Sequence, residues 1–253
     1  MNKKEFIEMQ NEFAEYIYRY EYFKKAGTIA DCYYHHYFSK DLDTVRFYNI
    51  ENTLLVELIK MKNDNKTEEE INEYIKGFKE KFDNESKVIE EKHKIAEDVY
   101  KKCESMTAEE KSQIEKDYLE YVKIGHPIVK CLPSKDEEAL FPIMSKLYRE
   151  NNYNGFKEMM NNNKEIFKPV EIKEENYPKV SGYYYEIKKG INNDFANTQN
   201  AYPYNKQETL KNEISIARET GEIKVRLNNL ISVNKQLHKD YVLAFGSDIS
   251  LKD

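Results

Sequence analysis

The amino-acid sequence predicts an all-α protein. Charged residues make up 34% of its 253 residues, and it contains only eight Gly and six Pro. This composition is typical of long helices rather than of a β-sandwich, a barrel or a doubly wound sheet. Hydrophobic residues make up 40% of the chain, with 21 Tyr and 12 Phe among them, so a folded core is expected rather than disorder. Apolar residues recur at intervals of three, four and seven along several segments, which predicts helices with one apolar face.

The N-terminal part of the chain predicts two helices in succession. Residues 3–25 place a set of apolar side chains on one helical face: Phe6, Ile7, Phe13, Tyr16, Ile17, Tyr20 and Phe23. Residues 27–28, a Gly followed by a Thr, predict a helix stop and a new N-cap. The second helix is expected to run to about Lys62, where the turn-forming residues 63–65 would end it.

A capping box predicts the start of a long helix. Thr67 and Glu70 have the spacing at which each side chain bonds the free backbone N–H of the other residue. The segment that follows has a heptad seam in which seven of nine positions are apolar: Ile71, Ile75, Phe78, Phe82, Glu85, Ile89, Lys92, Ala96 and Val99. Such a seam is typical of a coiled-coil helix.

A second seam lies near the C-terminus. It consists of Ile216, Thr220, Ile223, Leu227, Leu230, Asn234, Leu237, Tyr241 and Ala244. Asn234 falls on a core position, where a single polar residue often sets the register or the number of strands. We expect the two seam helices to pack antiparallel on each other, with self-association between chains as the alternative.

A helix-loop-helix pattern lies between the two seams. One helix is predicted from Thr107 to about Lys123, and a second is opened by Ser134 and ends near Tyr148. The loop between them contains His126-Pro127. Prolines and glycines are frequent in residues 168–205, which predicts loops and short helices there.

The sequence therefore predicts four regions. Residues 1–103 form a helical and coiled-coil region, and residues 104–165 form the helix-loop-helix module. Residues 166–205 form a loop-rich connector, and residues 206–253 contain the last coiled-coil helix.

Three sequence blocks around the loop carry a resemblance to a known family. They are 118–127 (YLEYVKIGHP), 134–141 (SKDEEALF) and 147–157 (LYRENNYNGFK), and the short motif Tyr202-Pro203-Tyr204 followed by Leu210 adds to them. Together with the flanking seams, they resemble bacterial cytosolic J-domain-like proteins, in which the J-like module is set between coiled-coil segments. The resemblance implies a cytoplasmic helical protein that binds a protein partner, which for an active J-domain is a DnaK-type chaperone.

The sequence departs from this family at two determinants of chaperone recruitment. Ile128 stands where the resemblance implies an Asp that contacts an Arg of the chaperone, and its side chain has no hydrogen-bond acceptor. The helix before the loop is normally basic, but residues 107–124 contain five acidic residues and three lysines, a local charge of −2. Both departures indicate that ordinary chaperone recruitment is lost.

The leading hypothesis is a non-enzymatic interaction or scaffold protein with a degenerate J-like loop. Its candidate partner-binding residues are His126, Pro127, Ile128, Val129, Lys123 and Lys130. Ile128 and Val129, together with Leu132, could form an apolar tip there, but burial against the following helix is the interpretation that the sequence favours. A divergent co-chaperone that stimulates a DnaK-type ATPase is the second hypothesis, for which Lys123, Lys130 and Lys135 are the candidate basic cluster. An inhibitor encoded by a phage or mobile element is the third.

The sequence offers little support for an enzyme, a cofactor or a metal site. Cys32 and His36 are one helical turn apart but lack further ligands at paired spacing, so packed helix residues are the simpler interpretation. His126 and Cys131 are a weak catalytic pair, and a His that caps a helix or holds the loop is more plausible. No phosphate-binding loop or hydrolase motif is present.

The net charge and the cysteine content limit which partners and which cellular compartment are expected. The net charge is −6 in runs of mixed sign, which argues against nucleic-acid binding because a phosphate backbone requires clustered Lys and Arg. No window approaches the length of apolar sequence that spans a bilayer. Three widely spaced cysteines predict a reduced, cytoplasmic protein without disulfides.

Overall fold

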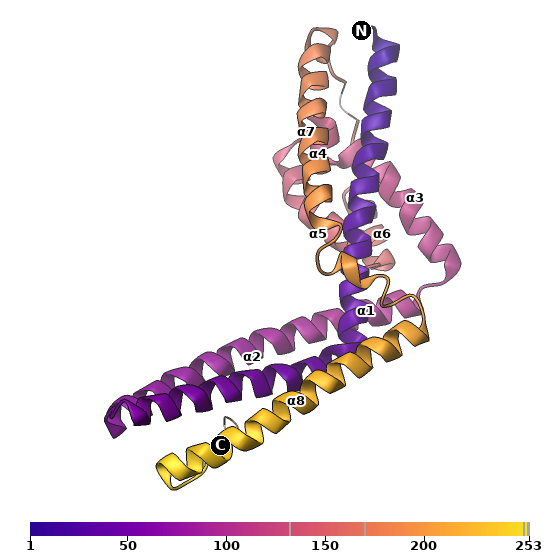
Figure 1. The fold of residues 1–253 in the computed structure, drawn as a ribbon. Coiled ribbons are helices and arrows are strands. Elements are labelled where there is room, and N and C mark those ends of the chain that lie inside the picture. The colour runs from indigo at the N-terminus through magenta and orange to yellow at the C-terminus, as the bar shows by residue number, and fades with distance from the viewer. Residues whose placement is uncertain (132, 170, 250, 252–253) are drawn as a thin grey trace. The chain divides into compact units, whose positions relative to one another are not determined.

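A computed structural model of the chain describes residues 1–131, 133–169, 171–249 and 251, and within these residues every regular element is helical (Figure 1). The predicted all-α class is therefore confirmed. The chain divides into two units. Unit 1 comprises residues 1–33 and 97–207, and unit 2 comprises residues 34–96 and 208–253. None of the helices in the described residues has both the length and the apolarity that a bilayer crossing requires.

The first helix, α1 (Lys3–Asn63), is continuous, and the stop expected at residues 27–28 is wrong. The hydroxyl of Thr28 donates to the carbonyl of Lys24 at 3.2 Å, a bond within the helix rather than a cap. Gly27 lies under the ring of Tyr204, where an added Cβ would stand 2.6 Å from ring carbons. The glycine therefore permits close packing in unit 1 and does not end the helix.

Unit 2 contains the second half of α1 together with α2 (Glu68–Ser105), up to residue 96, and α8 (Glu213–Phe245). The capping box of α2 is confirmed. The backbone N–H of Glu70 donates to Oγ1 of Thr67 at 3.2 Å, and that of Thr67 donates to Oε2 of Glu70 at 2.9 Å. In the α2 seam, Glu85 and Lys92 are exposed while the seven apolar positions are buried or half-buried, as a one-sided packing seam requires.

Replacing Thr67 by Ala should lower the free energy of unfolding by about 1 kcal/mol, because the substitution removes the N-cap acceptor. Thr67→Ser keeps the hydroxyl and serves as the matched control. Urea unfolding followed by circular dichroism measures the difference. Equal stability of the Ala and Ser variants would show that the cap contributes nothing.

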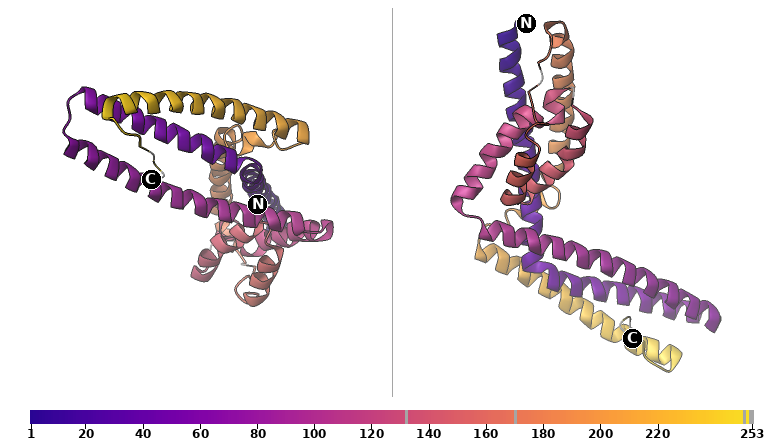
Figure 2. Two further views of the ribbon diagram at one scale, coloured as in Figure 1. Left: turned by 90° about the horizontal axis from the view of Figure 1, so that it is seen from below. Right: turned by 180° about the vertical axis from the view of Figure 1, so that it is seen from behind.

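The second half of α1 lies between α2 and α8 in unit 2 (Figures 1 and 2). Contacts with α2 run antiparallel, since Asp43 pairs with His93 and Arg46 with Glu85. Contacts with α8 run parallel, from the Tyr34–Glu219 hydrogen bond to that between Asn52 and the carbonyl of Leu230. The expected direct pairing of α2 and α8 is thus corrected to a three-helix arrangement, in which those two helices still run in opposite directions.

Asn234 occupies a buried polar position in this arrangement. Its side chain is 6% exposed, and its Nδ2 lies 2.9 Å from both Oε2 of Glu51 and Oδ1 of Asn52. A buried amide is tolerated only where its hydrogen bonds are made. The polar core position noted in the sequence therefore pairs α8 with α1 at one register.

Unit 1 packs the first half of α1 against shorter helices and the end of α2. The remaining elements of this unit are α3 (Ala108–Gly125), α4 (Pro127–Lys130), α5 (Lys135–Arg149), α6 (Tyr153–Asn162), η1 (Glu174–Asn176), α7 (Tyr177–Thr198) and η2 (Tyr204–Lys206). The predicted helix starts after Thr107 and Ser134 are confirmed, and each has a complete capping box.

The loop-rich connector expected at 166–205 contains a helix of 22 residues, α7, so that expectation is wrong for 177–198. Pro178 lies in the first turn, where a missing N–H costs no helical hydrogen bond. Two aromatic stacks with α1 bury one face of α7, Phe6 on Tyr177 at 3.9 Å and Phe13 on Tyr184 at 3.8 Å between ring centroids. This packing offsets the weak helix propensity of the glycines in the segment.

Candidate functional site

The His-Pro loop lies at the turn of an antiparallel helix pair in unit 1. The ring of Tyr118 on α3 stacks on that of Tyr148 on α5, with centroids 3.6 Å apart and planes 3° apart. The Tyr118 hydroxyl lies 3.2 Å from Oγ of Ser145, and both stacked tyrosines are fully buried. α3 and α5 thus form a hairpin that places residues 126–131 and 133–134 at its end.

His126 is a structural residue of this turn. Its Nδ1 accepts a hydrogen bond from the backbone N–H of Ile128 at 3.3 Å and so caps α4. Its ring packs edge-on against Phe141, and its side chain is 1% exposed. Burial, with a smaller effect from the positive charges of Lys24 and Arg149, lowers the pKa of His126 to about 3. The imidazole is therefore neutral near pH 7, which fits a helix cap rather than a general base or a surface contact.

Burial, rather than a place in an exposed apolar tip, is confirmed for Val129. Its side chain is fully buried, and its carbonyl accepts a hydrogen bond from the hydroxyl of Tyr184 on α7 at 2.5 Å. Pro127 and Ile128 are half-buried, and Leu132 lies outside the described residues. Burial is thus the interpretation that the structure favours, although α7 rather than the following helix supplies this hydrogen bond.

The three candidate lysines do not gather into one basic surface. Lys130 is 5% exposed, forms an ion pair with Glu137, and donates to the carbonyl of Lys168 at 2.7 Å. Lys123 is half-buried and pairs with Glu120 at 3.0 Å. Lys135 is exposed at the first turn of α5. A buried, paired lysine cannot steer a partner, so Lys130 drops out of the proposed cluster.

A buried polar network, missed from the sequence, connects α1 to this hairpin. Glu115 on α3 accepts hydrogen bonds from Lys25, from Tyr148 and from Tyr18, at 2.6, 2.5 and 2.7 Å. Burial lowers the pKa of Lys25, although Glu115 beside it favours the charged form. Each member has a partner of opposite charge or a hydrogen bond, as buried polar groups require.

Glu21 on α1 is a second carboxylate that accepts hydrogen bonds from the hairpin. Its Oε2 accepts from Arg149 at 2.6 Å (Nη2) and 3.0 Å (Nε), and its side chain is 3% exposed. A sequence signal for this network exists, because Glu21 and Lys25 continue the apolar stripe of Phe13 and Ile17 at intervals of four residues. Charged residues that extend an apolar helical stripe are candidates for buried pairs.

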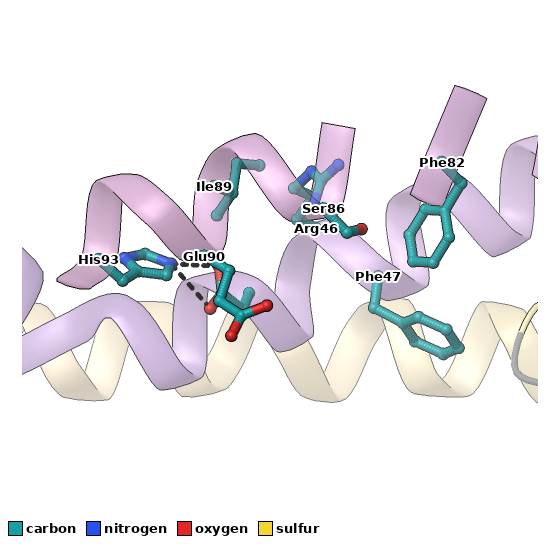
Figure 3. Close-up of a pocket in the computed structure, with 8 residues that line it drawn as sticks. Arg46, Phe47, Phe82, Ser86, Ile89, Glu90 and His93 are labelled. Carbon is teal, nitrogen blue, oxygen red and sulfur yellow. Dashed lines mark hydrogen bonds and ion pairs between the residues drawn. The ribbon is translucent and has the colours of Figure 1, made fainter. Parts of the chain in front are cut away.

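Unit 2 has an open hollow of about 230 Å³ between α1 and α2 (Figure 3). Its polar lining includes Asp43 and His93, which form an ion pair with an Nε2–Oδ2 distance of 2.9 Å. Arg46 also lines it and pairs at 3.4 Å with Glu85, which lies outside the lining. Ser86 and His93 lie seven residues apart, so about 10 Å separates them along the helix axis. The serine is therefore not placed for activation by this histidine.

The metal-capable residues of α1 do not form a site. Among the residues that the structure describes, no group of three or more His, Cys, Asp or Glu could hold a metal ion. Cys32 is buried in unit 1, and burial raises the pKa of its thiol to about 12. Cys131 adopts a left-handed conformation with φ of 58° at the end of α4, and its Sγ lies 3.7 Å from the carbonyl oxygen of Ile128.

Comparison with known proteins finds no matching family, no matching curated sequence and no matching solved structure. The function is therefore argued from the residues and their geometry.

Proposed function

We propose that this chain is a non-enzymatic protein that binds other proteins, and that the outward face of α8 in unit 2 is its main interaction surface. The observation that carries the proposal is a set of large apolar side chains on α8 that are at least 40% exposed: Ile214, Val225, Val233, Val242 and Leu243. Exposed apolar side chains that share one face of a helix are candidates for an interaction site, and Ile214, Val225 and Leu243 share one face of α8.

The spacing of these side chains defines a second apolar face. Val225 and Leu243 each stand two residues after a buried position, Ile223 and Tyr241 respectively. Two residues correspond to a rotation of about 200° around the helix axis, so the exposed set points away from the α1 side. Ile214 precedes Val225 by 11 residues, about three turns, and falls on the same face. Ile214, Val225 and Leu243 therefore lie on the side of α8 opposite its buried residues, while Val233 and Val242 lie about 80–100° to either side of them.

Three substitutions on this face, Ile214→Ser, Val225→Ser and Leu243→Ser together, should abolish partner binding while leaving the α-helical circular dichroism intact. Tyr185→Ser on α7, whose side chain is 67% exposed, is the matched control elsewhere on the surface. Affinity capture with quantitative mass spectrometry compares both variants with the wild type, and sedimentation velocity reports self-association. Partners retained equally by the triple variant would refute the assignment of this face.

A divergent DnaJ-like co-chaperone is the second candidate. It is supported by the antiparallel pairing of α3 and α5 around a His-Pro turn, the arrangement that the sequence resemblance implies. The burial of His126, Val129 and Lys130 leaves Lys123, Pro127 and Ile128 as the partly accessible candidate residues at that turn, which weakens the case. Stimulation of a DnaK-type ATPase by the wild type would support this candidate. Stimulation only by Ile128→Asp would indicate a module that has lost this partner.

A further inference from the structure

Unit 1 has a hollow of about 450 Å³ that no function proposed above uses, although its Arg149 also pairs with Glu21. Lys24 and Thr28 of α1, Arg149 of α5 and Tyr204 of η2 line it. A neighbouring hollow of about 370 Å³ shares Thr28 and Arg149 with it and adds Lys146. Two cations and two hydroxyls therefore converge on one concave surface.

The ammonium of Lys24 is incompletely satisfied. Its side chain is 31% exposed, and the one carboxylate within 4 Å among the described residues is that of Glu21, at 3.6 Å. This distance exceeds an ordinary N–H···O hydrogen bond. The ammonium also stands 4.1 Å from the ring centroid of Tyr20, a contact that supplies attraction but no lone pair.

The guanidinium of Arg149 has donors to spare. Its two hydrogen bonds, from Nε and Nη2, both end on Oε2 of Glu21. A guanidinium has five N–H donors, so the Nη1 edge remains available for a ligand. Lys24 and Arg149 share the one carboxylate of Glu21, so neither cation has an ion-pair partner of its own among the described residues.

One acidic residue, Asp31, also lines the hollow. Asp31 accepts a hydrogen bond from the hydroxyl of Tyr202. Seven residues separate it from Lys24, about 10 Å along the helix axis. The Lys24 end of the hollow is thus rich in donors, whereas the acceptor lies two turns away.

We propose that this hollow binds an oxyanion, a phosphoryl or carboxylate group, with the ammonium of Lys24 and the guanidinium of Arg149 as its main contacts. A planar guanidinium edge and an ammonium are the donors that such groups prefer. A bound oxyanion would supply the acceptors that Glu21 alone does not. The inference goes beyond the proposed interaction function and does not depend on α8.

Isothermal titration calorimetry of the full chain tests this site, with inorganic phosphate and succinate as separate probes at constant ionic strength. We expect saturable binding of at least one probe at one site per chain. Phosphate alone would identify a phosphoryl site, and succinate alone a carboxylate site. Lys24→Met should weaken binding by about tenfold or more, because a charged hydrogen bond is lost. Lys24→Arg should restore most of it.

Lys146→Met is the matched control, since Lys146 is 68% exposed and lines only the neighbouring hollow. It should change the affinity by less than about twofold, as expected for an exposed charge. The absence of saturable binding for both probes would overturn the proposal. An equal loss of affinity in Lys24→Met and Lys146→Met would also overturn it. If Lys24→Met does not fold, acetylation of the wild type decides the question. Phosphate or succinate should slow acetylation of Lys24 and not of Lys146, and equal rates would overturn the proposal.

Discussion

Replacing Lys130 by Met is expected to lower the free energy of unfolding by about 3–5 kcal/mol, the cost of breaking a buried ion pair by removing one partner. The side chains of Lys130 and Glu137 are 6% and 2% exposed. Loss of the ammonium leaves the Glu137 carboxylate without its counter-charge, although its other oxygen still accepts from the backbone N–H of Ser134 at 2.8 Å. Equilibrium unfolding in urea measures the loss.

Two companion variants show whether this loss arises from the buried charge. Lys130→Met with Glu137→Gln removes both charges and should recover a large part of the stability, because no buried charge is then left unpaired. Lys135→Met, at an exposed lysine of the same hairpin, should change the stability by less than about 0.5 kcal/mol. A comparably small effect for Lys130→Met would mean that this lysine is accessible, and would return it to the candidate partner-binding residues.

Acidification from pH 6.5 to pH 5 should destabilise the protein by about 2 kcal/mol through His126 alone. Its pKa in the folded protein is about 3, compared with 6.5 for an unhindered histidine. Between these two values the unfolded chain binds a proton that the folded protein does not. The free energy of unfolding therefore falls as the pH falls, by up to about 1.4 kcal/mol per pH unit. The contribution of the neutral His126 to the free energy of unfolding is fully present above pH 6.5.

The variant His126→Asn isolates this effect. Asn keeps a side-chain acceptor suited to the N-cap of α4 and does not titrate in this range. The difference in pH dependence between wild type and His126→Asn, measured by urea unfolding at pH 6.5 and pH 5, should be about 2 kcal/mol. His36→Gln, at an exposed histidine of α1, is the control for a histidine outside the hairpin. If His126→Asn keeps the pH dependence of the wild type, the imidazole is not buried as described.

Local sequence was sufficient for the helix starts and for the faces of the long helices. Thr67 and Ser134 cap their helices through hydrogen bonds to residues three positions away, so the whole motif lies within four consecutive residues of the sequence. The heptad seam of α2 was equally readable, because its burial pattern follows from helical periodicity alone. Asn234 could be recognised as a polar core position, but not as the partner of Glu51 and Asn52.

The candidate site was predicted less well. The sequence favoured a His126 that caps a helix or holds the loop, but it predicted neither the short helix α4 that His126 caps nor the burial of Lys130. Burial there depends on Tyr184 and Lys168, which lie 55 and 38 residues away along the chain. A lysine beside a turn looks solvated in sequence unless the segment that covers it is known.

By itself, the sequence determined that this protein is helical, where several of its helices begin and which faces they bury, because these properties depend on neighbours within one or two turns. Only the tertiary structure decided that α1 continues through Gly27, that α7 forms across its glycines, and that Glu21, Lys25 and Lys130 are buried. Each of these outcomes depends on a side chain from a distant segment, whose packing or charge outweighs a local preference of about 1 kcal/mol per residue.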